Sequence, residues 1–278
     1  MNYMFIYHYC TSETLKAILE YRTLRLSDIK KSNDSKEINY LFEQYKSWFL
    51  VKNEYNQNSL LDVNKIENDF KFQMENTIFL VMCFSKKKDD IHMWSCYGNK
   101  GVSIEFDKDE LENWIKYIRD YIPKDTKVKS IACDSVLKIC DVEYFNNNSI
   151  LKYLDKKIKF NNDDFLKLFK ESPFIKSDFF KYEEEVRIVY EHIFGSNLKN
   201  ALSYTNSNGE LKENVKFKSI STADYQHKMV IDIPIDYKLI KSIIIGPNSS
   251  LSEQDIKELL FIYNIENIKI VKSSGSYR

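Results

Sequence analysis

Residues 77–85 read TIFLVMCFS, a run made almost entirely of apolar side chains. The run is too short for most helices, so we predict a buried central strand over 77–85. The Lys-Lys-Lys-Asp-Asp run that follows at 86–90 predicts a solvated loop. On the other side of the strand, apolar residues at helical spacing predict a helix over about 59–76.

Further strands and helices are predicted outward from this run by the same periodicities. Strands are expected near 3–9, 23–29, 101–106, 127–144, 185–191, 215–221, 228–233, 241–247 and 267–272. Helices are expected after the caps Thr11–Ser12 and Asn33–Asp34, and near 91–98, 107–121, 149–171 and 251–261. The polar stretch 195–214 contains two glycines and predicts a long loop.

This order of elements predicts the α+β class, with the middle helices as an elaboration of the core. The chain has 278 residues, a length that allows one large domain or two small ones. No internal repeat and no linker interrupts the pattern, so we expect a single domain over 1–278.

Charge and hydropathy exclude two classes of protein. Lys and Arg number 41 and Asp and Glu number 41, so the chain lacks the basic excess of a nucleic-acid coat protein. No stretch approaches the roughly 20 apolar residues that a membrane-spanning helix needs. The first residues, MNYMFIYHYC, have no basic start and no long apolar core, so we expect no signal peptide and a cytoplasmic protein.

The cysteines do not follow a metal-binding or disulfide pattern. There are five, at 10, 83, 96, 133 and 140, without a Cys-x-x-Cys pair and without histidines at zinc-ligand spacing. We therefore predict buried thiols and no metal. The glycine-rich phosphate loops and the common hydrolase motifs are also missing from the sequence.

Two carboxylates and a guanidinium are predicted to share one face of a strand. In the segment YEEEVRIVY (182–190), alternation places Glu183, Glu185 and Arg187 on one side and Val186 and Ile188 on the other. Such a trio can stabilise a developing cation or orient a ribose hydroxyl, because the arginine keeps the neighbouring acids ionised. A solvated strand face with offsetting charges is the more frequent explanation of this pattern.

Three further features could contribute to a binding site. His8 ends the first strand just before a helix cap, where a merely hydrogen-bonded histidine is the common alternative. Trp94 and Tyr97 are three residues apart, so they would share a helix face and could form a wall for a planar ring, although core packing is more usual. Ser85 ends a buried strand and could reach a ligand.

Taken together, the motifs resemble a known bacterial family. Y-H-Y-x-T-S, L-R-L-S, N-D-x-x-E, C-F-S, M-W-x-x-Y-G, G-V-S-I-E-F, E-x-E-V-R and I-I-I-G-P occur in that order between about residues 3 and 275. This series resembles the domain of unknown function numbered 2971. That family is in turn similar to the ADP-ribosyltransferase superfamily, which implies a split antiparallel β-sandwich core with inserted helices.

The superfamily likeness implies roles for individual residues. His8 would hold a ribose of NAD, Tyr97 or Trp94 would stack on nicotinamide, Glu185 would be the catalytic glutamate and Glu183 the upstream acid. Arg25 or Arg22 would contact the diphosphate. The remaining residues expected to bind the nucleotide are Tyr9, Thr11, Ser27, Ser85 and Arg187. If the likeness holds, His8, Tyr97 and Glu185 line one cleft.

The resemblance implies an enzyme that consumes NAD without a metal, a bacterial toxin or phage-defence effector that modifies nucleic acid or protein. A non-catalytic nucleotide- or partner-binding module of a defence system is the first alternative. A metal-dependent nuclease is the second alternative. Such an enzyme needs clustered acids, and residues 183–185 are the one tight acidic cluster of the sequence. Basic stretches near 124–129 and 152–159 keep nucleic acid open as a partner, although an ordinary solvated helix face is the preferred explanation of them. No membrane contact is expected, and the sequence predicts no oligomeric state.

Overall fold

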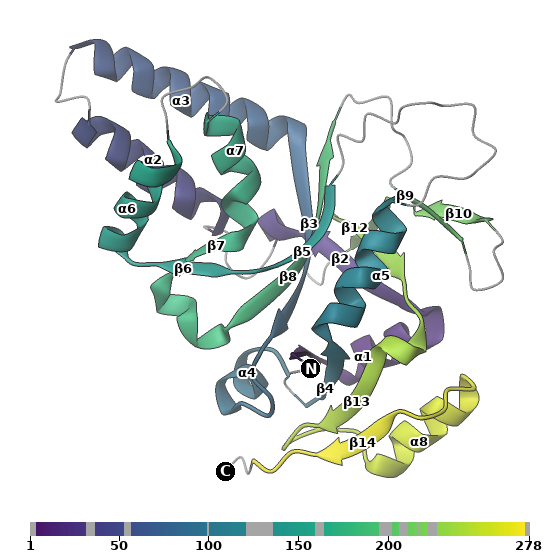
Figure 1. The fold of residues 1–278 in the computed structure, drawn as a ribbon. Coiled ribbons are helices and arrows are strands. Elements are labelled where there is room, and N and C mark those ends of the chain that lie inside the picture. Colours follow the sequence, from purple (N-terminus) through teal and green to yellow (C-terminus); the bar gives the residue numbers. More distant parts are fainter. Residues whose placement is uncertain are drawn as a thin grey trace.

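The computed structural model describes residues 4–31, 37–52, 57–98, 100–120, 136–158, 164–194, 202–205, 211–215, 217–221 and 227–275. Within these residues the chain forms a ten-stranded, largely antiparallel sheet with helices against it (Figure 1). The α+β class predicted from the sequence is confirmed.

The helices and strands follow in an irregular order along the chain. The α-helices are α1 (Ser12–Tyr21), α2 (Glu37–Lys52), α3 (Gln57–Asn76), α4 (Ile91–Cys96), α5 (Lys108–Asp120), α6 (Asn147–Lys157), α7 (Asp164–Glu171) and α8 (Glu253–Ile262). The strands of the large sheet are β1 (Phe5–Cys10), β2 (Thr23–Asp28), β3 (Thr77–Ser85), β4 (Val102–Asp107), β5 (Val136–Asp141), β8 (Glu185–Ile193), β11 (Lys218–Ser221), β12 (His227–Pro234), β13 (Ile240–Ile245) and β14 (Lys269–Lys272). Two small pairs join β6 (Glu143–Phe145) to β7 (Ile175–Ser177) and β9 (Leu202–Thr205) to β10 (Leu211–Val215).

The strand β3 is the branching point of the sheet. Along one edge it pairs with β8 over its whole length, from Thr77 opposite Ile193 to Ser85 opposite Glu185. Along its other edge it pairs first with β2, at Leu80 and Val81, and then with β1, at Ser85. The predicted buried central strand is therefore confirmed, and β1 and β2 separate beside residues 82–84.

Alternation along β3 feeds two separate cores. Leu80, Met82 and Phe84 point into the larger core, which α1, α5 and α8 cover. Phe79 and Val81 point the other way, where they meet side chains of α2 and α7. Figure 1 shows α2, α3, α6 and α7 gathered on that second side. Two apolar faces explain why β3 reads as a continuous apolar run rather than an alternating one.

The sequence predictions for two longer stretches of the chain are wrong. The helix expected over 149–171 is divided, because Ile158 takes an extended conformation and ends α6. The stretch 195–214, expected to be a long loop, contains β9 and the start of β10. The two strands pair with each other, so their backbone N–H and C=O groups form hydrogen bonds that the polar composition of the stretch did not predict. Some predictions fall outside the described residues. They concern the helix cap at Asn33 and Asp34, the part of the predicted strand over 127–135, and Cys133.

Candidate functional site

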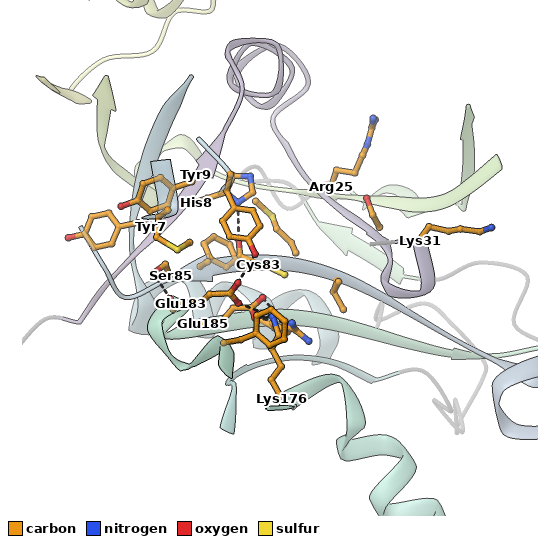
Figure 2. A pocket seen from close by; sticks show the side chains of 18 of the residues that line it. Tyr7, His8, Tyr9, Arg25, Lys31, Cys83, Ser85, Lys176, Glu183 and Glu185 are labelled. Carbon is orange, nitrogen blue, oxygen red and sulfur yellow. Dashed lines mark hydrogen bonds and ion pairs between the residues drawn. The ribbon is translucent and has the colours of Figure 1, made fainter. Parts of the chain in front are cut away.

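A cavity of about 590 Å³ opens where β1 and β2 separate beside β3. This volume lies within the range of about 300–1,000 Å³ that is usual for small-ligand sites. Figure 2 shows the side chains that surround it. The lining residues come from segments far apart in the sequence: Tyr7, His8, Tyr9, Arg25, Ser27, Lys31, Val81, Met82, Cys83, Phe84, Ser85, Met93, Tyr97, Lys176, Phe180, Glu183, Glu185, Arg187 and Lys228.

The cavity reaches the open edge of β3. Successive side chains of a strand point to opposite faces, so a cavity on one face would contact every second residue. This cavity contacts the five consecutive residues 81–85. The opening between β1 and β2 therefore exposes both faces of β3 at residues 81–85 to the cavity. A neighbouring strand paired along this edge would cover them.

The predicted pair Glu185 and Arg187 shares one face of β8, and both side chains line the cavity. Val186 and Ile188 point into the larger core, as alternation predicted. Glu183 is placed differently from the prediction, since it ends a 3-10 helix (Asp178–Glu183) instead of lying on the strand. Glu184 follows with a φ of 44° and turns the chain, so that Glu183 and Glu185 still enter the same cavity.

A buried lysine joins the two glutamates. The Lys176 ammonium donates to Glu183 Oε2 at 2.8 Å and to Glu185 Oε2 at 3.2 Å. All three side chains are at most 7% exposed, and Figure 2 shows them converging. Such close pairing offsets the cost of removing three charges from water.

Arg187 fixes the second carboxylate from the other side. Its Nε and Nη2 donate to Glu185 Oε1 and Oε2 at 2.9 and 2.8 Å, and its Nη1 donates to the carbonyl of Pro173 at 2.6 Å. Burial alone would raise the pKa of Glu185, but Arg187 and Lys176 lower it to about 2. Glu185 is thus ionised at neutral pH although its side chain is almost completely buried.

Tyr97 and Trp94 have different roles because α4 ends at Cys96, before Tyr97. The prediction that the two rings share a helix face is therefore wrong. Tyr97 enters the cavity, where its hydroxyl donates to Glu183 Oε1 at 2.6 Å. Burial and this bond to a carboxylate raise the pKa of Tyr97. Trp94 is buried outside the lining, with its Nε1 donating to Asp89 Oδ1 at 2.8 Å and its ring edge-on to Tyr9.

His8 lies at the edge of the opening and has a defined tautomer. Its Nδ1 is 2.9 Å from the carbonyl oxygen of Cys83, and a carbonyl can only accept, so Nδ1 carries the proton. Burial lowers the pKa of His8, which favours the neutral ring. In that form Nε2 is an acceptor for a ligand hydroxyl. His8, Tyr97 and Glu185, which we expected to line one cleft, all line this cavity.

The other predicted binding residues divide into three groups. Tyr9 and Ser85 line the cavity but also hold its wall, since Tyr9 donates to the carbonyl of Lys87 at 2.8 Å and Ser85 to that of Glu183 at 2.6 Å. Ser27 lines the cavity from β2. Thr11 lies outside the lining, because its side chain caps α1 by accepting from the Thr14 backbone N–H.

The two arginines considered for a diphosphate contact are both occupied. Arg25 lines the cavity, but its guanidinium binds both carboxylate oxygens of Asp232, at 2.7 and 3.0 Å. Arg22 lies outside the lining and packs over the ring of Tyr237. Neither guanidinium is therefore held ready for a ligand.

One of the three comparisons with known proteins gives a match. Residues 93–188 match the family described as protein of unknown function (DUF2971). The predicted likeness to this family is confirmed for that segment. No curated protein and no solved structure matches the chain.

The segment that matches the DUF2971 family carries the charged cluster of the cavity. Tyr97, Lys176, Glu183, Glu185 and Arg187 all lie within it. The cavity residues of β1, β2 and β12, among them His8 and Lys228, lie outside it. The pocket is thus completed by strands that the family match does not cover.

Several cavity residues were missed by sequence reasoning. Lys176 stands alone in β7, and nothing in its neighbourhood distinguishes it from the other lysines of the chain. Lys31, Phe180 and Lys228 likewise have no periodic signal. The prediction of buried thiols is wrong for Cys83 and Cys96, which are exposed, and Cys83 faces the cavity because β1 and β2 leave the edge of β3 open.

Metal and membrane criteria give negative results for the part of the chain described. No group of three or more His, Cys, Asp or Glu side chains is arranged to hold a metal ion there. None of the helices in the same residues combines the length and the apolar character needed to cross a bilayer.

Proposed function

We propose that this protein is an ADP-ribosyltransferase-like enzyme that uses NAD as substrate. The observation that carries the proposal is that His8, Tyr97 and Glu185 line one cavity. The superfamily likeness assigns ribose binding to His8, catalysis to Glu185 and ring stacking to Tyr97 or Trp94, and of these two aromatic residues Tyr97 lines the cavity. The opening between β1 and β2 supports the split-sheet architecture that the same likeness implies.

The residues of the cavity suit the breaking of a nicotinamide–ribose bond. In this reaction the bond between C1′ and the ring nitrogen breaks, nicotinamide leaves with the electron pair, and the acceptor atom bonds to C1′ and loses a proton. Positive charge develops on the ribose during bond breaking, and a fixed, ionised carboxylate such as Glu185 stabilises it electrostatically. Arg187 and Lys176 orient that carboxylate.

Two further side chains position the substrate in this proposal. The Tyr97 ring offers a stacking surface for nicotinamide, since its hydroxyl is already anchored on Glu183. His8 Nε2 accepts from a ribose hydroxyl, because Nδ1 is committed to the Cys83 carbonyl. Nucleic acid, protein and water remain the candidate acceptors.

A second candidate function is a non-catalytic nucleotide-binding module. It is favoured by the charge balance at the cluster, where Lys176 and Arg187 neutralise Glu183 and Glu185. A carboxylate whose charge is largely offset stabilises a developing cation less than a free one does. The same pocket would then bind a nucleotide without turning it over.

The test is nicotinamide release from NAD by the purified protein, alone and with DNA, RNA or cell lysate as acceptor, together with the mass shift of the acceptor. We expect release, and its loss in the Glu185→Gln variant. Glu191→Gln is the matched control, because Glu191 is buried on the same strand, pairs with Lys170 and lies outside the cavity lining.

Thermal unfolding of both variants shows whether they remain folded. No release with any acceptor, or equal release by Glu185→Gln, overturns the catalytic proposal. Stabilisation of the protein by NAD without turnover favours the binding module.

A further inference from the structure

The charged side chains of the cavity are unequal in number. Five cationic residues line it, namely Arg25, Lys31, Lys176, Arg187 and Lys228, against the two anionic residues Glu183 and Glu185. A cavity with such an excess of positive charge attracts an anionic ligand.

Most of this positive charge is neutralised within the protein. Lys176 and Arg187 are paired with the two glutamates. Arg25 is paired with Asp232, which lies outside the lining. The two remaining cations, Lys31 and Lys228, lie at the β2–β12 end of the cavity, and Figure 2 shows Arg25 and Lys31 well away from Glu183 and Glu185.

Lys228 is the notable cation of this end. Its ammonium donates to the carbonyl of Lys31 at 3.4 Å, and among the described residues it forms no ion pair. The side chain is partly buried, and this burial lowers the pKa of Lys228. The nearby charge of Asp28 acts in the opposite direction, but Asp28 forms no ion pair with Lys228. Burying the ammonium therefore remains costly, and a ligand anion offsets that cost.

The register of the strands explains how Lys228 reaches the cavity. Val230 of β12 lies opposite Ser27 of β2, and Asp232 lies opposite Arg25. Because alternate residues share a face, Lys228, Ser27 and Arg25 project from the same side of the β2–β12 pair. The hydroxyl of Ser27 and the ammonium of Lys228 therefore face the same volume, with Lys31 at its edge.

We infer that Lys228, together with Lys31 and Ser27, forms a phosphate-binding subsite for a small nucleotide at the β2–β12 end of the cavity. The subsite residues come from β12, from β2 and from the 3-10 helix after β2 (Ile29–Lys31), whereas Glu183, Lys176 and Glu185 come from β7, β8 and the 3-10 helix between them. One ligand can therefore contact the lysines with its phosphates and the glutamates with its reacting group. This inference deepens the proposed function, since it assigns the phosphates of the substrate to the lysines rather than to Arg25 or Arg22. Phosphate oxygens accept readily from ammonium and hydroxyl donors.

The test compares ligands with and without phosphate groups, and AMP and adenosine differ by the phosphate alone. Binding of ADP-ribose, AMP, pyrophosphate and adenosine to the full chain is measured by calorimetry at fixed ionic strength. We expect Lys228→Met to weaken ADP-ribose and AMP binding about tenfold and to leave adenosine binding unchanged. Lys228→Arg should retain most of the affinity, because it keeps the positive charge.

Lys241→Met is the matched control, because Lys241 of β13 is also partly exposed but pairs with Glu110 of α5 and lies outside the cavity lining. This variant should bind every probe as the unaltered protein does. Thermal unfolding shows whether each variant is folded.

Three outcomes overturn the inference. They are unchanged ADP-ribose binding in Lys228→Met, an equal loss of adenosine binding in that variant, and failure of every phosphate-bearing probe to bind the unaltered protein.

The subsite and the proposed enzyme activity can be contradicted separately. Phosphate-dependent binding through Lys228 without nicotinamide release supports the subsite and contradicts catalysis. Nicotinamide release that is unchanged in Lys228→Met supports catalysis and contradicts the subsite.

Discussion

The guanidinium of Arg187 holds both carboxylate oxygens of Glu185, at 2.9 Å from Nε and 2.8 Å from Nη2. The two residues are neighbours on one face of β8, and the guanidinium is almost completely buried. Without Arg187, Glu185 would keep Lys176 as its one charged partner among the residues that the structure describes. This pair therefore holds the negative charge on which the proposed chemistry depends.

Replacing Arg187 should destabilise the fold strongly. Arg187→Met leaves Glu185 buried and short of a partner, and breaking a buried ion pair from one side costs about 3–5 kcal/mol. Urea unfolding measures the change in the free energy of unfolding. Lys257→Met is the control, because its i,i+4 pair with Glu253 is exposed and contributes about 0.3–0.5 kcal/mol. Similar losses in both variants would contradict the assigned role of the buried pair.

The Glu185 carboxylate should also contribute to acid unfolding. The pKa of Glu185 is lowered from 4.5 to about 2 in the folded protein, so its contribution to stability is present above pH 4.5. It is lost as the pH falls from 4.5 toward 2, because the unfolded chain takes up the proton first. The total is on the order of 3 kcal/mol.

The measurement is the free energy of unfolding of the protein and of Glu185→Gln across this range of pH. The difference between them should shrink as the pH falls from 4.5. Parallel curves for the two proteins would show that Glu185 is not the group responsible.

The ring and the hydroxyl of Tyr97 should have separable effects. If the ring stacks on nicotinamide, Tyr97→Ala should raise the KM for NAD about five- to tenfold, from a stacking contribution of about 1–1.5 kcal/mol. Tyr97→Phe keeps the ring and removes the donor to Glu183, so it should affect kcat more than KM. Steady-state kinetics of nicotinamide release give both constants. A KM that rises equally in both variants would argue against stacking.

The thiol of Cys83 should report occupation of the cavity. Cys83 is exposed and lines the cavity, whereas Cys96 is exposed outside its lining. Saturating ADP-ribose should slow iodoacetamide alkylation of Cys83 several-fold and leave Cys96 unaffected. Peptide mass spectrometry follows the two sites in one sample. Equal rates at Cys83 with and without ligand would place the ligand elsewhere.

Gly101 should be intolerant of a side chain. A Cβ at this position would lie 2.0 Å from the carbonyl oxygen of Cys10 and 2.7 Å from Thr11 Cα, both backbone atoms next to the cavity strand β1. Gly101→Ala should therefore cost about 1–3 kcal/mol or more, measured by urea unfolding. Gly275→Ala is the control, since its nearest atoms would be at ordinary contact distance, 3.4 Å and beyond. An unchanged Gly101→Ala variant would refute the close packing described.

Local sequence patterns predicted much of the secondary structure correctly. The strand β3 has the bounds that its apolar run predicted, and the alternation over 185–190 placed Glu185 and Arg187 on one face and Val186 and Ile188 in the core. These predictions succeed because the period of a strand depends on neighbouring residues. The prediction for Trp94 and Tyr97 failed, because the helix ends between them and the end of a short helix is poorly marked in sequence.

The sequence by itself therefore determined the α+β class, the central strand and the acidic residues of the candidate site. Only the tertiary structure decided which side chains meet. Lys176 lies between Glu183 and Glu185, and Lys228 comes to the same cavity from β12, more than 40 residues beyond Arg187. The physical reason is that the cavity forms where β1 and β2 part beside β3, and pairing between distant strands leaves no local pattern in the chain.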